Sequence, residues 1–284
     1  MTATEPKACV IGWPVDHSLS PLIHRHWLKR YALKGDYDRL AVSPEEIAGF
    51  LGAFADQGLV GCNVTLPHKE TAFRLACRTS HLARRLGAAN TLWLEDGELV
   101  ADNTDTHGFL ANLDEMAAGW DNAETALVIG AGGAARAIIA GLIDRRFRKV
   151  ILANRTPERA SALAQWFGAD ETVHMSAIPL DDLNAALSGA DLIVNTTSAG
   201  LGGSPLLDVD WSSVSRAAIA TDILYVPLIT PFLSGAAEAG LTIVDGLGML
   251  LHQAVPGFHK WFGVMPEVDD ALRRRLLAAL DGGD

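Results

Sequence analysis

The feature that most constrains the fold is the segment LVIGAGGAAR, residues Leu127–Arg136. The apolar residues 126–129 are typical of a buried parallel strand. The pattern G-x-G-x-x-A follows, ends at Ala135 and leads into a small, aliphatic stretch typical of a helix packed on a sheet. Such a turn points backbone N–H groups at one place, where the helix dipole also favours negative charge. The segment therefore predicts a site for a dinucleotide pyrophosphate; the alternative is a glycine-rich turn of an ordinary α/β protein.

The position of this turn predicts two domains. About 125 residues precede it, and the 284-residue chain is long enough for a separate domain on its N-terminal side. In that first region predicted strands alternate with helices, and a hairpin is predicted at Asp96-Gly97, so we expect an open, mostly parallel α/β sheet. In the second region we expect further strands at Lys149–Ala153, Ala190–Asn195, Ala217–Leu224 and Leu241–Val244, with helices at Pro157–Phe167 and Leu180–Leu187.

Composition narrows the range of partners. The formal net charge of −11 disfavours general nucleic-acid or anionic-membrane binding, which need basic patches, but it permits a small anionic substrate held by local donors. No apolar run approaches the ~20 residues of a membrane span, and no signal-peptide pattern opens the chain.

Three cysteines without C-x-x-C spacing indicate reduced thiols and a cytoplasmic protein. His24 and His26 point to different helix faces, so we expect no metal site.

The end of the next predicted strand indicates which dinucleotide is bound. An acid about 20 residues beyond the glycines would accept a hydrogen bond from the ribose 2′-OH of NAD. This chain has Asn154, Arg155 and Thr156 there, with Arg159 one helical turn later. Guanidinium groups match the oxygens of a 2′-phosphate, so the pattern favours NADP over NAD; the alternative is a solvated, arginine-rich helix start.

Polar residues gather at the strand-to-helix junctions of the first region. In open α/β sheets ligands bind outside the carboxyl ends of the strands, so these side chains predict a site for a polyhydroxylated small molecule. Each alone could be a cap or turn residue; Ser20, for example, suits the N-cap of a helix beginning at Pro21. Lys69 lies in the first turn of a predicted helix, where a positive charge is unfavourable next to the positive end of the helix dipole. A residue so placed against the local rule more often belongs to a functional site than to the ordinary surface. The residues of this set are Ser18, Ser20, Asn63, Thr65, Lys69, Asn90 and Asp105.

Taken together, these motifs resemble the shikimate dehydrogenase family nearly end to end. The matching segments are SLSP (18–21), NVTLPHKE (63–70), AANT (88–91), DNTD (102–105), GAGGAAR, NRT, NTTSAG (195–200), DILYVPLITPFL (222–233) and GLGMLLHQA (246–254). The resemblance implies an NADP-dependent oxidoreductase acting on a CH–OH group. It would interconvert 3-dehydroshikimate and shikimate by hydride transfer, in chorismate and aromatic amino-acid biosynthesis.

The resemblance also implies residue roles. Lys69 would be the catalytic acid and base, with Asp105 beside it, and Ser18 and Ser20 would hold the substrate carboxylate. The ring hydroxyls would be bound by Asn63, Thr65, Asn90 and Gln253, with Tyr225 by the substrate. The cofactor would be bound by Gly130, Ala131, Gly132, Gly133, Ala134, Asn154, Arg155, Thr156, Arg159, Thr196, Thr197, Ser198, Gly246 and Met249.

The family's domain arrangement follows from the same resemblance. Residues 1–105 and 247–284 would form the substrate-binding domain, because the C-terminal helices return to it, and residues 106–246 would form a Rossmann-type NADP domain. We expect a monomer or homodimer that binds a small-molecule substrate.

Two positions depart from the family pattern, and two other functions stay open. His68 stands where the family usually has Phe, and Thr106 where it has Gly; we expect His68 to be a partly exposed structural residue. One alternative is an NAD-using quinate/shikimate dehydrogenase, against which Asn154-Arg155-Thr156 argues. The other is a non-catalytic NADP-binding regulator, against which the presence of both Lys69 and Asp105 argues.

Overall fold

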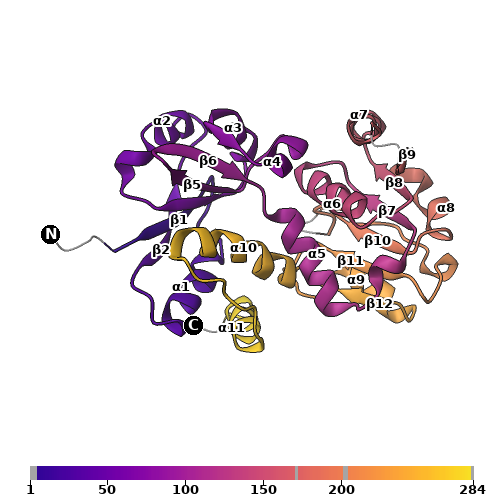
Figure 1. The fold of residues 1–284 in the computed structure, drawn as a ribbon. Helices are drawn as coiled ribbons and strands as arrows, with labels where there is room; N and C mark the ends of the chain where they lie inside the picture. The colour runs from indigo at the N-terminus through magenta and orange to yellow at the C-terminus, as the bar shows by residue number, and fades with distance from the viewer. Residues whose placement is uncertain (1–4, 170–171, 201–203, 283–284) are drawn as a thin grey trace. The chain divides into compact units, whose positions relative to one another are not determined.

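The chain folds into two compact α/β units, each built on a six-stranded sheet (Figure 1). The computed structural model describes residues 5–169, 172–200 and 204–282. Residues up to Asp105 and from Leu251 onward form the first unit, and Thr106–Leu250 form the second. The predicted α/β class with two domains is confirmed.

The sheet of the first unit has the order β2-β1-β3-β5-β6-β4. Its one antiparallel strand, β5, pairs with β3 and β6, and the β5–β6 hairpin turns at the predicted Asp96-Gly97, where both residues have positive φ (55° and 79°). The remaining pairs are parallel. The strands are β1 (Lys7–Gly12), β2 (Asp36–Ala41), β3 (Gly61–Val64), β4 (Arg78–Thr79), β5 (Thr91–Glu95) and β6 (Glu98–Asp102).

One face of this sheet carries a core rich in aromatic rings. The His24 ring stacks on Tyr37 with centroids 3.9 Å apart, and Phe258 and Trp261 lie beside it. The indole N–H of Trp261 donates to the carbonyl of Leu92 at 2.9 Å and so fixes the C-terminal helix to the sheet. The helices of this unit are α1 (Ser20–Arg30), α2 (Ile47–Gly52), α3 (Lys69–Leu75), α4 (His81–Leu86), α11 (Asp270–Leu280) and the later part of α10 (Leu247–Phe262).

The sheet of the second unit is parallel throughout, with the order β12-β11-β10-β7-β8-β9. This is the doubly wound order in which the chain starts at the centre, with β7, and reverses between β7 and β10. The strands are β7 (Thr125–Ile129), β8 (Lys149–Asn154), β9 (His174–Pro179), β10 (Leu192–Asn195), β11 (Ile219–Asp222) and β12 (Thr242–Val244).

Helices cover both faces of this sheet. Leu183 of α8 and Leu233 of α9 pack with Leu127 and Ile193 on one face. The alternate strand residues, such as Val128, are also fully buried, and α6 and α7 contact β7 and β8. The helices are α5 (Asp105–Met116), α6 (Gly133–Asp144), α7 (Pro157–Phe167), α8 (Leu183–Leu187) and α9 (Pro231–Glu238).

Three details differ from the sequence-based expectations. The strand β9 and the two-residue β4 were not predicted; both lie at a sheet edge, and β9 contains no fully buried residue that would mark it as a strand. Ser20 is not a helix N-cap, because that position is Leu19 and no side chain caps the helix.

In the described part of the chain, no helix is long and apolar enough to cross a membrane.

Candidate active site

A lysine–aspartate pair lies at the carboxyl edge of the first sheet. Lys69 begins α3 just after β3, and Asp105 follows β6. The Lys69 Nζ lies 2.5 Å from Oδ2 of Asp105. The Asp105 side chain is 10% exposed and that of Lys69 is 28% exposed, so the ammonium remains accessible while its partner is largely enclosed. The pair can therefore hold a proton at a fixed place that a small molecule can reach.

Asn90 connects this pair to its surroundings. Its side-chain N–H₂ donates to Oδ1 of Asp105 at 2.8 Å and to Oε1 of Gln253 at 3.1 Å. Its side-chain oxygen accepts from the Thr104 backbone N–H at 2.8 Å and from the Thr91 hydroxyl at 2.9 Å. Four residues predicted separately, Lys69, Asn90, Asp105 and Gln253, are thus brought into one hydrogen-bonded group.

The side chain of Asn63 is positioned by Tyr37, which was not predicted to belong to the site. The Tyr37 hydroxyl donates to Oδ1 of Asn63 at 2.6 Å, and both groups are buried. The Asn63 N–H₂ donates to the Asn90 carbonyl at 3.2 Å and to the Thr91 hydroxyl at 3.3 Å. Both amide hydrogens are thereby engaged, which leaves one lone pair of Oδ1 for a ligand.

Ser18 and Ser20 face each other at the start of α1. Their hydroxyl oxygens are 3.2 Å apart, and the Ser20 backbone N–H lies 3.3 Å from the Ser18 hydroxyl. Arg39 of β2 holds this turn through Nε and Nη2, which donate to the Ser18 carbonyl at 2.9 and 2.6 Å. Neither hydroxyl caps α1, and the Ser18 hydroxyl donates to that of the buried Ser20.

Thr65 follows β3 and packs against the end of β1. A Cβ at Gly12 would overlap the Thr65 side chain, so glycine permits this approach. The Thr65 backbone N–H donates to the Ile11 carbonyl at 2.9 Å, which fixes the turn that leads to Lys69.

His68 and Thr106, the two residues that depart from the family pattern, each have a hydrogen-bond partner in the structure. His68 is buried, not partly exposed as expected, because its Nε2 lies 2.7 Å from the Val42 carbonyl. Thr106 is buried in α5 and donates its hydroxyl to the Ala137 carbonyl of α6 at 2.8 Å. Neither side chain is hydrogen-bonded to the Lys69–Asp105 pair.

The glycine turn of the second unit has the geometry of a phosphate cradle. Gly130 has φ +110°, and a Cβ there would overlap the Thr196 hydroxyl, so only glycine fits. A Cβ at Gly132 or Gly133 would meet nothing within 4 Å, so these backbones face open space at the N-terminus of the 12-residue α6. Ala131 and Ala134, also predicted here, are half-buried in the same turn.

The residues predicted to select NADP follow β8. Asn154 ends the strand and donates its side-chain N–H₂ to the Thr156 carbonyl at 2.8 Å, which shapes the turn. Arg155 and Arg159 are exposed, and neither guanidinium forms an ion pair within the described residues. The strand thus ends in Asn154 and not in an acid, and two cations follow it, with Glu158 between them in the first turn of α7.

A buried polar network lies at the ends of β10 and β11. Asn195 and Asp222 are aligned in the sheet, and the Asn195 N–H₂ donates to Oδ2 of Asp222 at 2.9 Å. The Thr230 hydroxyl donates to the same oxygen at 2.7 Å, and burial raises the pKa of the Asp222 carboxyl. Oδ1 of Asn195 accepts from the Thr197 backbone N–H at 3.0 Å and from its hydroxyl at 2.8 Å. The network thus fixes the loop that carries the predicted cofactor residues after β10.

The other predicted residues of that region lie in the second unit. The Thr196 hydroxyl donates to the Ile129 carbonyl at 2.8 Å, and Ser198 is exposed. Gly246 lies so close to the Ile223 carbonyl that a Cβ would overlap it, and Met249 is half-buried. Burial raises the pKa of the Tyr225 hydroxyl. The roles assigned to Tyr225, Gly246 and Met249 remain predictions.

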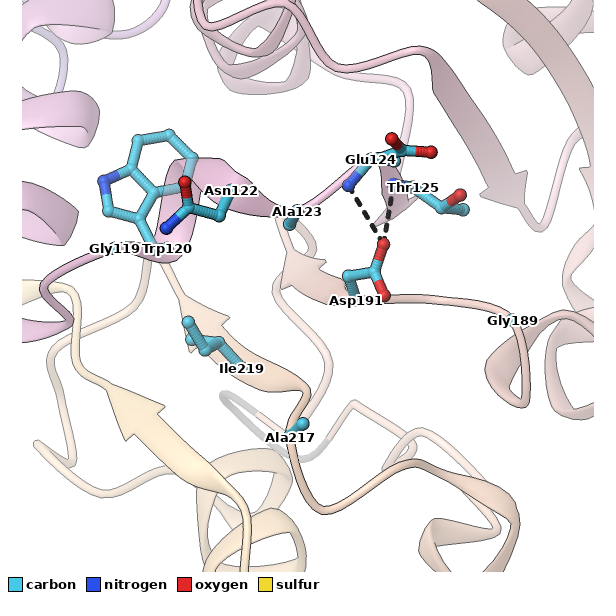
Figure 2. Close-up of a pocket in the computed structure, with 10 residues that line it drawn as sticks. All are labelled: Gly119, Trp120, Asn122, Ala123, Glu124, Thr125, Gly189, Asp191, Ala217 and Ile219. Atoms are coloured by element: carbon cyan, nitrogen blue, oxygen red, sulfur yellow. Dashed lines mark hydrogen bonds between the residues drawn. The ribbon is translucent and has the colours of Figure 1, made fainter.

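A depression of about 610 Å³ lies at the opposite, amino end of the second sheet. Figure 2 shows Asp191 on its wall, where Oδ2 accepts from the backbone N–H groups of Glu124 and Thr125 at 3.0 and 2.9 Å. This carboxylate ties the start of β7 to the start of β10. Because ligands of doubly wound sheets bind at the carboxyl ends, the depression is not the expected cofactor site.

Sequence reasoning missed the residues that support the site from behind. Asn195 and Asp222 had a usable signal, since each is a polar residue closing an apolar strand. Tyr37 and Arg39 had none, because their partners are distant in the sequence. Among the described residues, no group of three or more His, Cys, Asp or Glu side chains is arranged to hold a metal ion.

A Rossmann-type sheet with an open glycine turn, joined to a second α/β unit with a lysine–aspartate pair, defines a two-domain, dinucleotide-dependent oxidoreductase. Three family models match the chain: the shikimate dehydrogenase substrate binding domain over residues 10–92, shikimate / quinate 5-dehydrogenase over 113–218, and the shikimate 5′-dehydrogenase C-terminal domain over 246–274.

Relatives match over nearly the whole length. Proteins of Azorhizobium caulinodans and Rhizobium meliloti, both named shikimate dehydrogenase (NADP(+)), are each 52% identical over 96% of this chain and 96% and 95% of their own. The chain belongs to the shikimate dehydrogenase family.

Solved structures agree in fold. Shikimate dehydrogenase of Thermus thermophilus, in complex with NADP(H) and shikimate, has a TM-score of 0.82 and 36% identity, covering 95% of this chain and 99% of its own. Quinate dehydrogenase of Corynebacterium glutamicum, in complex with NAD, has a TM-score of 0.87 and 28% identity, covering 96% and 99%.

Proposed function

We propose that this chain catalyses the reversible, NADPH-dependent reduction of 3-dehydroshikimate to shikimate. Its relatives named shikimate dehydrogenase (NADP(+)) are about half identical to it over nearly their full length. The observation that carries the proposal is the Lys69–Asp105 pair, at 2.5 Å, with the side-chain amide of Asn90 donating to Asp105 at 2.8 Å. The exposed ammonium end of this pair supplies what carbonyl reduction needs besides a reductant, namely a proton donor.

The second unit fits NADP by three independent features. The open backbone at Gly132 and Gly133 leaves room for a pyrophosphate at the α6 N-terminus. Arg155 and Arg159 offer guanidinium groups to a 2′-phosphate, and the strand before them ends in Asn154 and not in an acid. When bound, the reduced cofactor supplies the hydride.

Lys69 then acts as the general acid. Its ammonium Nζ donates a proton to the substrate's 3-oxygen as negative charge develops there. Asp105 accepts one Nζ hydrogen and so orients the ammonium, while Asn90 holds Oδ1 of Asp105 in place. In the reverse direction the Lys69 side-chain nitrogen accepts the proton that the 3-hydroxyl loses.

The remaining polar groups orient the substrate. Ser18 and Ser20 present two hydroxyls, 3.2 Å apart, to the carboxylate. Gln253, whose Oε1 accepts from Asn90, binds a ring hydroxyl next to the catalytic pair, and Asn90 binds one by exchanging its hydrogen bond to Gln253 for one to the substrate. Thr65 and Asn63 contribute on the β3 side.

The decisive experiment measures reduced-nicotinamide absorbance with shikimate or quinate, each with NADP or NAD. Strong turnover with shikimate and NADP alone is expected. A preference for quinate or NAD would mean that the Ser18–Ser20 turn or the Arg155–Arg159 pair has been misassigned. NADP binding without turnover of any combination would instead favour the regulator.

We also propose that the protein acts in the cytoplasm as a monomer or homodimer. Its cysteines Cys9, Cys62 and Cys77 are free thiols, which suits a reducing compartment. Light scattering at micromolar concentration would give the oligomeric state, and fractionation of cells that express the protein would give its location.

A further inference from the structure

The edge strand β2 presents two side chains on one face toward predicted substrate residues. Tyr37 and Arg39 are two residues apart, so they share a face of the strand. The Tyr37 hydroxyl donates to Asn63, and the Arg39 guanidinium donates twice to the Ser18 carbonyl. The strand therefore supports two parts of the proposed substrate site from behind, and at one of them it supplies a positive charge.

Few acidic side chains close by could pair with the positive charge of Arg39. Asp36 and Asp38 lie on the other face of β2, where both are in contact with Arg25, at 2.9 and 3.7 Å. Arg39 forms no ion pair within the described residues. Its guanidinium has five N–H donors, and only two of them donate to the Ser18 carbonyl. Its side chain is half-buried, so its field is screened less than that of an exposed arginine.

The Ser18–Ser20 turn needs such a charge if it binds a carboxylate. Two neutral hydroxyls bind an anion more weakly than a charge-assisted pair does, and this chain carries a net charge of −11. The nearest assigned cation of the site, Lys69, is already paired with Asp105.

We propose that Arg39 determines the specificity of this site for a carboxylate-bearing substrate, by fixing Ser18 and placing an unpaired guanidinium at the main-chain carbonyl of the Ser18–Ser20 turn. Arg39 acts in this way as a positioning residue and as the cation of an anion subsite. The inference rests on the proposed function, because it takes the serine turn to bind the shikimate carboxylate.

The test compares shikimate with its uncharged methyl ester in the full-length protein, with saturating NADP. For Arg39→Gln we expect the KM for shikimate to rise about tenfold or more, as loss of a charge-assisted interaction does, while kcat changes less than threefold. The KM for the methyl ester should stay within about twofold. Arg39→Lys keeps the positive charge but lacks the planar guanidinium, so its KM for shikimate should lie between those of the wild type and Arg39→Gln.

Arg78→Gln is the matched control. Arg78 lies on β4, the opposite edge strand of the same sheet, where it pairs with Glu95 and Glu98, and the substitution removes the same single charge. Its KM values should match those of the wild type. Raising the salt concentration should increase the shikimate KM of the wild type more than that of Arg39→Gln.

Three results would overturn the inference. An Arg39→Gln KM within twofold of the wild type would show that the charge does not act on the substrate. Equal KM increases for shikimate and the ester would show that Arg39 only holds the turn. If Arg39→Gln did not fold, equal increases over the wild-type KM for the ester and for shikimate in Arg39→Lys would have the same meaning. A wild type that turns over neither compound would instead refute the proposed function.

Discussion

His24 should make the first unit sensitive to acid, and replacing it should remove that sensitivity. Its ring is fully buried and stacked on Tyr37, and neither ring nitrogen has a hydrogen-bond partner among the described residues. Burial therefore lowers the pKa of His24 from 6.5 to about 3, with the nearby Asn63 amide opposing part of this effect. The folded chain accordingly keeps His24 neutral at any pH near neutrality.

The sign and size of the effect follow from proton linkage. Above the unfolded pKa of 6.5 both states hold His24 neutral, so its contribution to stability is complete. Below that value the unfolded chain binds a proton that the folded chain refuses until about pH 3, so stability falls as the pH falls through this window. At pH 5 the loss is 1.5 pH units at 1.36 kcal/mol each, or about 2 kcal/mol.

Urea unfolding at pH 7 and pH 5, followed by intrinsic fluorescence, measures this difference. His24→Phe keeps an aromatic ring on Tyr37, so we expect it to be at least as stable as the wild type at pH 7 and to lose about 2 kcal/mol less on acidification. His81→Gln, an exposed histidine of the same unit, is the control and should follow the wild type. The reasoning fails if His24→Phe and the wild type lose the same stability between the two pH values.

Four further substitutions test the proposed site and its glycine turn. Lys69→Ala should lower kcat by about 10²–10⁴ while KM for shikimate changes less than fivefold, since it removes a proton donor; steady-state kinetics would refute this if both constants changed comparably. Arg155→Gln should raise KM for NADP about tenfold and leave that for NAD unchanged, as measured with each cofactor; equal shifts would exclude a 2′-phosphate contact. Gly130→Ala should cost about 2 kcal/mol or more of stability, because its Cβ would overlap Thr196 at a positive φ. Gly132→Ala, which has open space, should leave the melting temperature unchanged but weaken NADP binding in a fluorescence titration.

The elements that the sequence predicted well are those whose signal is local. The strand at Thr125–Ile129 and the glycine turn after it were recognisable because four apolar residues and three glycines follow one another. The hairpin at Asp96-Gly97 was equally clear, since both turn residues must adopt positive φ. The edge strands β9 and β4 gave no such signal, because β9 has no fully buried residue and β4 has only two residues, whereas the edge strand β12 was predicted.

Local rules were wrong at Ser20 and His68, where another contact competes with them. Ser20 has the residue type of an N-cap, yet its hydroxyl lies against Ser18, and α1 begins without a side-chain cap. His68 was expected at the surface, but the Val42 carbonyl from another strand end accepts its ring N–H and makes burial favourable. In both cases the deciding partner lies outside the helical turn from which the expectation was drawn.

The fold class, the family and the available chemistry could be predicted from the sequence, because they depend on residue types at fixed spacings along the chain. Lys69, Asp105 and the glycine turn carry that information without any distant partner. Only the tertiary structure decided that Asn90 joins Lys69, Asp105 and Gln253 in one group, and that Tyr37 and Arg39 support Asn63 and Ser18. The physical reason is that a hydrogen bond acts over about 3 Å in space, whatever the separation in sequence, so the chain must fold before its partners exist.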